Sequence, residues 1–288
     1  MRAEARDLLL SDVERRVALR EIGAFRALSD EAIGAIARLS RRRALPPGSA
    51  TVVAPGAERT LMKLLSGDLQ VTRMGRASAV THDPRVLGMY WLARDSMPLE
   101  LETDGGAVVL ELPGGGMDEV LEEHFSVWLG VAQSVATWLL NLAPASSSRV
   151  IDRHLGADAS RLTGRIAALQ EAMPFARGYV DALMQLDEEA ATVRYQAGDV
   201  VWRPGDAADG VLVLLDGALR GVAPDEPSGI GSLELFANRP RVTALEAVAP
   251  TTVLRIGKEI LFDLVEDHHE LARDLLAMIA AAIVQTIE

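Results

Sequence analysis

The sequence predicts an α+β fold, mainly β, in which two successive copies of one module each place short strands between helices. Three observations predict it. The chain matches itself at an offset of 150 residues, short β-branched runs alternate with Gly, Pro and Asp turns, and apolar residues at helical spacing close each copy. At 288 residues, the chain is long enough for two domains that each bury a core.

Three pairs of matching segments carry the repeat. They are ALREIGAF (18–25) with ALQEAMPF (168–175), LLSGDLQ (64–70) with LLDGALR (214–220), and residues 120–136 with 264–280. The last pair has an offset of 144, so the first copy holds several extra residues before its later strands. We therefore predict domains at 1–143 and 161–288. Residues 144–160 are predicted to be an exposed linker, because they are rich in Ser, Pro and Ala.

Two different spacings of apolar residues along the sequence predict the strands and the closing helices. In the second copy, GVLVLLDGALRGV and RVTALEAVAPTTVLRI are β-branched runs separated by turn residues, as in a small antiparallel barrel or sandwich. Apolar residues then recur at helical spacing at the end of both copies, which predicts long amphipathic helices over 125–142 and 268–287. These residues are Val127, Val131, Val135, Trp138 and Leu142 in the first copy and Leu271, Leu275, Met278, Ile279, Ala282 and Ile283 in the second.

Composition excludes several classes of function. The chain has no cysteine, which excludes disulfide scaffolds and thiolate sites and suits the cytoplasm, where we expect the protein. The chain contains no run of about 18 apolar residues, so no membrane span is predicted. The net charge is −12, and residues 183–288 hold 18 Asp and Glu against 8 Lys and Arg. Such an acidic half repels a phosphate backbone, so nucleic acid is not an expected partner. A membrane is not an expected partner either, because no apolar span is predicted.

Catalytic and metal-binding motifs are not apparent. The glycine run at 113–120 lacks the lysine and spacing of a P-loop, and is interpreted as a strand-to-helix turn with Asp118 as the N-cap. His268 and His269 lie at a predicted helix junction without a well-spaced third ligand. We therefore expect no enzymatic activity, no catalytic residue and no metal site.

A family resemblance rests on two segments of the second copy, YQAGDVVWRPGDAADGVLVLLDGALRGV and GIGSLELFANRPRVTALEAVAPTTVLRI. They resemble the cyclic-nucleotide-binding domain of the catabolite activator protein and of kinase regulatory subunits. The first copy matches the same pattern through its LPPG and LLSGDLQVTR segments, then more loosely. The resemblance implies two tandem jelly-roll β-barrels, each flanked by helices and each with a phosphate-binding cassette. Transcription factors of this family append a helix-turn-helix after the long helix; the sequence stops at Glu288, so operator binding is not expected.

The cassette of the second copy keeps part of the family pattern, which is Gly-Glu-Leu-x-Leu, four residues, then Pro-Arg and a small or hydroxyl residue. The resemblance implies that a buried arginine and backbone N–H groups neutralise the cyclic phosphate, while the glutamate accepts a hydrogen bond from the ribose. On this basis the candidate ligand-binding residues are Gly231, Ser232, Leu233, Arg241, Val242 and Thr243.

Two departures leave the ligand of this cassette open. Ser232 replaces the glutamate, a change that forfeits on the order of 3- to 30-fold in affinity for a ribose. Glu234 lies two positions further on and is expected to point elsewhere if the segment winds as a helical turn. Arg241 then either binds a cyclic nucleotide or another small anion, or pairs with a carboxylate of this acidic domain.

The first copy has a more degenerate cassette at 87–102. Gly88 and Pro98 align with the family pattern, but Met89 and Leu99 replace both charged anchors. An ordinary cyclic-nucleotide site is therefore not expected in this copy, since a buried phosphate contact is often worth about 2–5 kcal/mol.

Two functions remain open from the sequence. The first is a non-enzymatic regulatory protein whose second domain binds a small, nucleotide-like anion through Arg241. The alternative is a ligand-independent interaction scaffold, in which helices 125–142 and 268–287 support homo- or hetero-oligomers. Both predict a protein partner that the sequence does not identify, and a homodimer through the long helices is one form of it.

Overall fold

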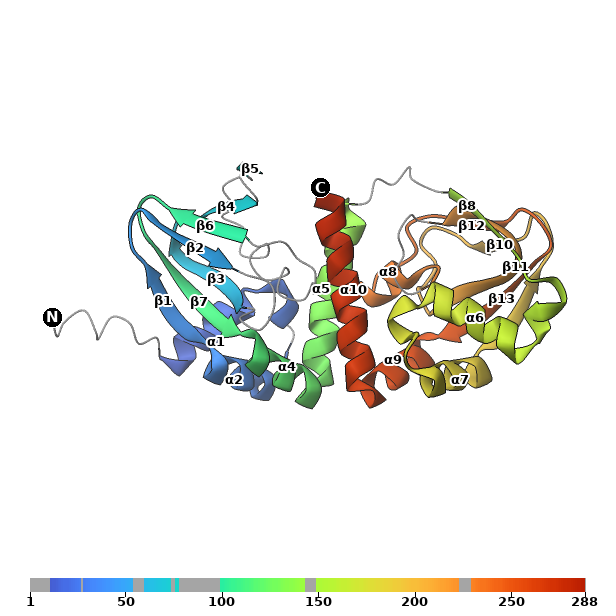
Figure 1. The fold of residues 1–288 in the computed structure, drawn as a ribbon, viewed down its shortest axis with the longest axis horizontal. Helices are drawn as coiled ribbons and strands as arrows, with labels where there is room; N and C mark the ends of the chain where they lie inside the picture. Colours follow the sequence, from blue (N-terminus) through green and yellow to red (C-terminus); the bar gives the residue numbers. More distant parts are fainter. Residues whose placement is uncertain are drawn as a thin grey trace. The chain divides into compact units, whose positions relative to one another are not determined.

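The computed structural model describes residues 11–26, 28–53, 60–73, 76–77, 99–142, 149–222 and 229–287. The chain divides into two compact units, Met1–Ser134 with Ile287–Glu288, and Val135–Thr286. In each unit, helices precede and follow a set of antiparallel strands in the sequence (Figure 1).

The described strands of the first unit form two small antiparallel sheets. Their strand orders are β1-β7-β3 and β2-β6-β4-β5. The strands are β1 (Arg41–Leu45), β2 (Ser49–Val53), β3 (Thr60–Gly67), β4 (Gln70–Arg73), β5 (Arg76–Ala77), β6 (Leu99–Thr103) and β7 (Ala107–Pro113). The helices are α1 (Asp12–Arg20), η1 (Gly23–Phe25), α2 (Asp30–Leu39), α4 (Gly114–Glu123) and α5 (Phe125–Leu142), whose residues from Val135 onward are counted with the second unit. Leu45, Met62, Leu69, Leu101 and Val109 pack together in a core cluster of this unit.

The second unit joins its strands into one sheet with the order β10-β12-β11-β13-β9, and β8 also pairs with β11. The strands are β8 (Arg149–His154), β9 (Ala191–Tyr195), β10 (Val200–Trp202), β11 (Gly210–Val222), β12 (Leu245–Ala247) and β13 (Thr251–Gly257). The helices are η2 (Gly156–Ser160), α6 (Leu162–Ala172), η3 (Pro174–Ala176), α7 (Val180–Glu189), α8 (Ser232–Phe236), α9 (Lys258–Asp267) and α10 (His269–Ile287). Its core cluster includes Leu212, Leu219, Leu245, Ala247 and Val253.

Corresponding elements of the two units begin at the offsets seen in the sequence. Helices α2 and α7 and strands β1 and β9 begin 150 residues apart, whereas β7 and β13, α4 and α9, and α5 and α10 begin 144 apart. The long strand β11 covers the positions that β3 and β4 occupy in the first unit. The mixed helix-and-strand architecture is therefore confirmed, with the same order of these elements in both units.

The predicted linker at 144–160 needs correction in its second half. Residues 149–154 form strand β8, in which Arg153 pairs with Gly217 and Ile151 with Leu219. Residues 156–160 form η2. The strand forms because β11 presents backbone N–H and C=O groups that require partners, and the β-branched Val150 and Ile151 suit an extended backbone.

The predicted N-cap at Asp118 is also wrong. Helix α4 begins at Gly114, its N-cap is Pro113, and Asp118 lies within the helix. Met117, Val120 and Leu121 are buried along one face of α4. Burial of this apolar face outweighs the low helix propensity of the three glycines that open the helix.

The long closing helices lie at the predicted positions, as α5 and α10. Helix α9 ends at Asp267 and α10 begins at His269, so the two histidines do occupy a helix junction. Leu271, Leu275 and Ile279 of α10 are buried, as their spacing predicts. Over the residues that the structure describes, no helix combines the length and apolar character needed to cross a bilayer.

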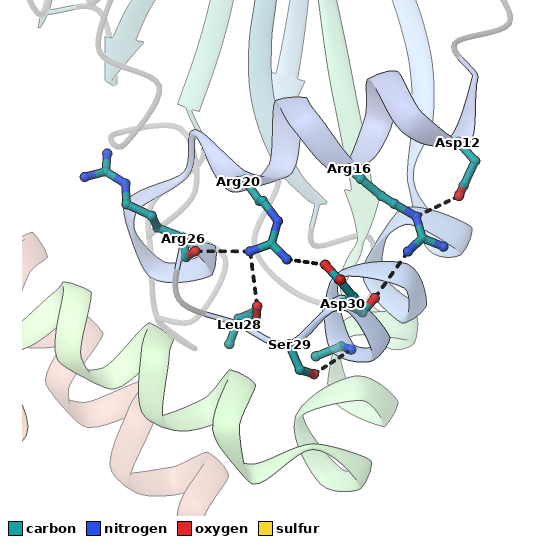
Figure 2. A network of polar contacts seen from close by, with 8 residues as sticks. Asp12, Arg16, Arg20, Arg26, Leu28, Ser29 and Asp30 are labelled. Atoms are coloured by element: carbon teal, nitrogen blue, oxygen red, sulfur yellow. Dashed lines mark hydrogen bonds and ion pairs between the residues drawn. The ribbon is translucent and has the colours of Figure 1, made fainter.

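Arginines hold α1 against the start of α2 in the first unit (Figure 2). Arg20 donates from Nη1 to the carbonyl oxygens of Arg26 at 3.2 Å and Leu28 at 3.1 Å, and its Nη2 lies 2.6 Å from a carboxylate oxygen of Asp30. Arg16 donates to the backbone carbonyl of Asp30 at 3.3 Å. These bonds satisfy carbonyl groups of the turn between the helices and so fix the angle at which the chain enters α2.

Candidate functional site

The predicted cassette folds as a short helix followed by a sharp return. Gly231 precedes α8 with a φ of +84°, a left-handed conformation that favours glycine. A Cβ at this position would lie 2.2 Å from Nη1 of Arg241 and 3.0 Å from the Trp202 ring. Two reasons therefore favour glycine at position 231: the left-handed backbone angle, and the space that the missing side chain leaves for the guanidinium group of Arg241.

Arg241 is buried and held by its own domain. Its Nη1 donates to the carbonyl oxygen of Gly231 at 2.6 Å, and its Nη2 donates to that of Gly210 at 2.5 Å. The guanidinium carbon lies 4.1 Å from the centroid of the Trp202 ring, a cation–π contact. Arg241 is 4% exposed. Two strong acceptors and an aromatic face thus fix this side chain in one place.

Glu234 completes the surroundings of Arg241. Its Oε2 lies 3.8 Å from Nη1 of Arg241, and the side chains are 6% and 2% exposed, respectively. Its Oε1 accepts a long hydrogen bond of 3.5 Å from the backbone N–H of Val242. One carboxylate therefore contacts both the arginine and a backbone donor of the cassette. Of the two alternatives for Arg241, this ion pair corresponds to the second.

Glu234 points to Arg241 and to the N–H of Val242, and the backbone explains why. The expectation that it does not replace the family glutamate at a ribose stays a prediction. Helix α8 has five residues, and Asn238 then adopts a φ of +51° that reverses the chain. The N–H of Arg239 donates to the carbonyl oxygen of Glu234 at 3.0 Å. The returning segment therefore passes directly beside Glu234, which a prediction from helical direction alone does not include.

The other candidate residues differ in their surroundings. Ser232 and Leu233 are buried in α8, whereas the side chain of Val242 is exposed. The hydroxyl of Thr243 donates to the carbonyl oxygen of Gly221 at 3.3 Å. The structure thus brings Gly231, Arg241 and the N–H of Val242 together around Glu234, while Thr243 bonds to β11. The role of these six residues as ligand contacts stays a prediction.

Arg241 also lines a cavity of about 340 Å³. Its lining includes Tyr195, Trp202, Asp206, Asp209, Arg241 and Arg255. Arg255 pairs with Asp209 at 2.6 Å, and Asp206 accepts a hydrogen bond from the N–H of Arg203 at 2.7 Å. Burial raises the pKa of the Tyr195 phenol above its ordinary value. The cavity combines aromatic rings with two arginines and two aspartates, so the described part of its lining has no excess of positive charge.

Trp202, Gly210 and Glu234 contribute to this site beyond the residues predicted from the pattern. Glu234 offered a signal, since it is the one acidic residue in the apolar run SLELF. Trp202 and Gly210 offered none, because their proximity to Arg241 depends on strand pairing. Residues 87–98 of the first copy's cassette, including Gly88, Met89 and Pro98, lie outside the described residues, and Leu99 begins β6.

A comparison with protein families assigns the fold around this cassette. Residues 192–268 match the model of the cyclic nucleotide-binding domain family. This part of the chain has the fold of a cyclic nucleotide-binding domain. The match spans β9 to the end of α9 and includes all six candidate residues. Cyclic nucleotide-binding domains are regulatory and not catalytic.

Comparisons with individual proteins give distant matches. Lysophospholipase nte1 of Neurospora crassa is 24% identical over 152 residues, which cover 48% of this chain and 9% of that protein. This chain therefore spans less than a tenth of that curated relative. The regulatory domain of Toxoplasma gondii PKA with cAMP is 12% identical, with 94% of this chain and 96% of that chain covered and a TM-score of 0.34. The regulatory subunit of a cAMP-independent protein kinase A from Trypanosoma cruzi, bound to guanosine, is 13% identical, with coverage of 86% and 81% and a TM-score of 0.34.

Proposed function

We propose that this protein is a non-enzymatic, cytoplasmic regulatory protein built from two tandem jelly-roll domains of the cyclic-nucleotide-binding type, and that its second domain works without a bound nucleotide. The proposal adopts the ligand-independent alternative. Arg241, the residue expected to neutralise a cyclic phosphate, is already paired with Glu234 and bonded to Gly231 and Gly210. This internal neutralisation is the observation that supports the proposal.

The free-energy cost of displacing Glu234 supports it further. A phosphate that takes the place of Glu234 beside Arg241 must separate the guanidinium from that carboxylate, and the displaced carboxylate remains as a second negative charge in the same buried place. Breaking a buried ion pair typically costs about 3–5 kcal/mol, which corresponds to roughly two to four orders of magnitude in affinity. Among the described residues that line the adjacent cavity, two aspartates, Asp206 and Asp209, accompany the two arginines, so these residues add no net positive charge for a phosphate.

Calorimetric titration of the full chain with cyclic AMP and cyclic GMP tests the proposal. We expect the same heats of dilution for the wild-type protein and for Arg241→Ala, with no saturable binding. Saturable binding to the wild type with a Kd of about 10 μM or tighter, lost in Arg241→Ala, contradicts the proposal.

With the nucleotide absent, protein contacts carry the regulatory role in this proposal. The long helices α5 and α10 are the proposed interaction surfaces, including a homodimer of the chain. Light scattering after size-exclusion chromatography tests this part. We expect an oligomer whose mass is unchanged by millimolar cyclic AMP, whereas a monomer under both conditions contradicts the homodimer.

A further inference from the structure

The surroundings of Glu234 have the composition of an anion site whose anion belongs to the protein. A buried arginine and a backbone N–H, from Arg241 and Val242, face the same carboxylate at 3.8 and 3.5 Å. Both distances are long for charge-assisted hydrogen bonds, which are typically about 2.7–2.9 Å. The carboxylate thus neutralises the arginine without reaching optimal geometry with either donor.

We infer that Glu234 is an internal substitute for a phosphate group, and that removing its charge converts the cassette into a binding site for phosphate and phosphate esters. The inference rests on the proposed function, since it explains how the wild-type domain stays independent of nucleotide. It assigns to Glu234 an autoinhibitory role that the family pattern does not contain, because that position is unspecified in Gly-Glu-Leu-x-Leu.

Three features make the vacated place suitable for a small phosphate. The first is charge, since Glu234→Ala removes the carboxylate that lies 3.8 Å from the buried guanidinium of Arg241. The second is orientation, since the hydrogen bonds to Gly231 and Gly210 and the Trp202 ring hold the guanidinium in position independently of Glu234. The third is space beside the arginine, since Arg241 also lines a cavity of about 340 Å³ that can hold the organic group of a phosphate ester bound to the guanidinium.

Thermal unfolding of full-length variants in sodium phosphate, against sodium chloride of equal ionic strength, tests the inference. We expect Glu234→Ala to have a lowered Tm in chloride and to recover stability in phosphate, while the wild type responds equally to both salts. The double variant Glu234→Ala/Arg241→Gln is expected to lose the specific response to phosphate. Glu234→Gln, which keeps the shape of the side chain, provides a second folded variant if the alanine variant is too unstable for titration.

A matched control is available in the same unit. Glu246 lies 3.8 Å from Arg220, the same separation as in the buried pair, but its side chain is 42% exposed. Glu246→Ala is expected to respond to phosphate as the wild type does, because its arginine is already solvated. A phosphate response equal to that of Glu234→Ala overturns the inference, since it shows a general effect of charge.

Titration with cyclic AMP separates this inference from the proposed function. We expect Glu234→Ala or Glu234→Gln to bind inorganic phosphate or cyclic AMP at least about tenfold more tightly than the wild type. Folded Glu234 variants that bind neither probe overturn the inference and leave the proposed function intact. Tight binding of cyclic AMP by the wild type overturns the proposed function, and it also overturns the inference unless the Glu234 variants bind more tightly still.

Discussion

The two units have the same β-bulge in one strand, whereas their buried polar side chains differ. Gly67 and Gly217, 150 residues apart, have φ values of +88° and +100°. The pairing register shifts just before each glycine, between Leu64 and Ser66 in β3 and between Leu214 and Asp216 in β11. The repeat has thus kept a β-bulge at the same point in both sheets, where the chain approaches a neighbouring strand too closely for any side chain.

Buried polar groups, in contrast, differ between the units. Lys63 is 2% exposed on β3, whereas the corresponding Val213 on β11 is apolar and 1% exposed. Asp187 is buried on α7 and pairs with Arg165 at 2.6 Å, whereas the corresponding residue of α2 is Ala37. The comparison teaches that backbone geometry constrains this repeat at its bulges, while each unit places its own buried charges.

The largest expected effect comes from placing a side chain at the shared bulge. Gly217→Ala puts a Cβ 2.4 Å from the carbonyl oxygen of Pro250, and Gly67→Ala puts one 2.2 Å from that of Gly106. We expect each variant to lose about 3–5 kcal/mol of unfolding free energy, from left-handed strain and overpacking together. Urea denaturation measures this loss.

The matched control for these two variants is Gly198→Ala. Gly198 has a φ of +91°, but a Cβ there meets no described atom within 4 Å. Only the backbone strain remains, so we expect a loss of about 1–2 kcal/mol. Equal losses at Gly198 and Gly217 contradict the explanation by close approach.

A second prediction concerns the Arg165–Asp187 ion pair of the second unit, whose corresponding described residues in the first unit are Arg15 and Ala37. Asp187→Ala leaves Arg165, whose side chain is 28% exposed, without its carboxylate partner. Removing one partner of a buried pair costs about 3–5 kcal/mol, and partial hydration of Arg165 reduces the expected loss to about 2–3 kcal/mol. Chemical denaturation of Asp187→Ala measures it. Glu189→Ala, an exposed change on the same helix, is expected to stay within about 0.5 kcal/mol of the wild type.

A third prediction concerns the buried lysine found only in the first unit. Lys63 pairs at 2.5 Å with Glu21, whose side chain is 66% exposed. Glu21→Ala leaves the buried ammonium group without this partner, so we expect a loss of about 1–3 kcal/mol. Lys63→Val copies the residue of the second unit and is expected to be neutral or stabilising, because it removes the need to bury a charge. A larger loss in Lys63→Val than in Glu21→Ala reverses the predicted order and contradicts this account.

The smallest expected effect concerns Tyr195, which stands on β9 where the first unit has Leu45 on β1. Burial raises the pKa of Tyr195 above 10.0, nearby Asp199 also raises it, and Arg255 opposes the shift. The folded state therefore binds the phenolic proton more tightly than the unfolded state, so stability from this group is present below pH 10.0 and lost as the pH rises through the folded pKa. Tyr195→Phe is expected to reduce this alkaline loss. Ultraviolet titration of tyrosinate in both proteins measures the shift in the pKa of Tyr195. The difference between the wild-type and Tyr195→Phe curves is the titration of Tyr195 itself. If this difference matches the titration of a tyrosine with an ordinary pKa, the prediction is contradicted.

Much of the architecture was predictable because it depends on local spacing. Helices α5 and α10 follow from apolar residues at helical intervals, and β11 follows from a β-branched run around Asp216–Gly217. Strand β8 was missed because its pairing depends on an unpaired edge of β11, some 60 residues further along the chain. The position of Gly231 at a turn and of Arg241 in the cassette came from the pattern alone.

The sequence by itself determined the repeat, the order of helices and strands, and the presence of a glycine and an arginine at cassette spacing, because all of these are set by neighbouring residues. Only the tertiary structure decided what Arg241 binds. Its acceptor Gly210 lies 31 positions away and Trp202 lies on another strand, so sheet register brings them to the guanidinium group. The reversal at Asn238 turns the chain back past Glu234 and places one buried carboxylate beside Arg241, the second of the two alternatives that the sequence left open.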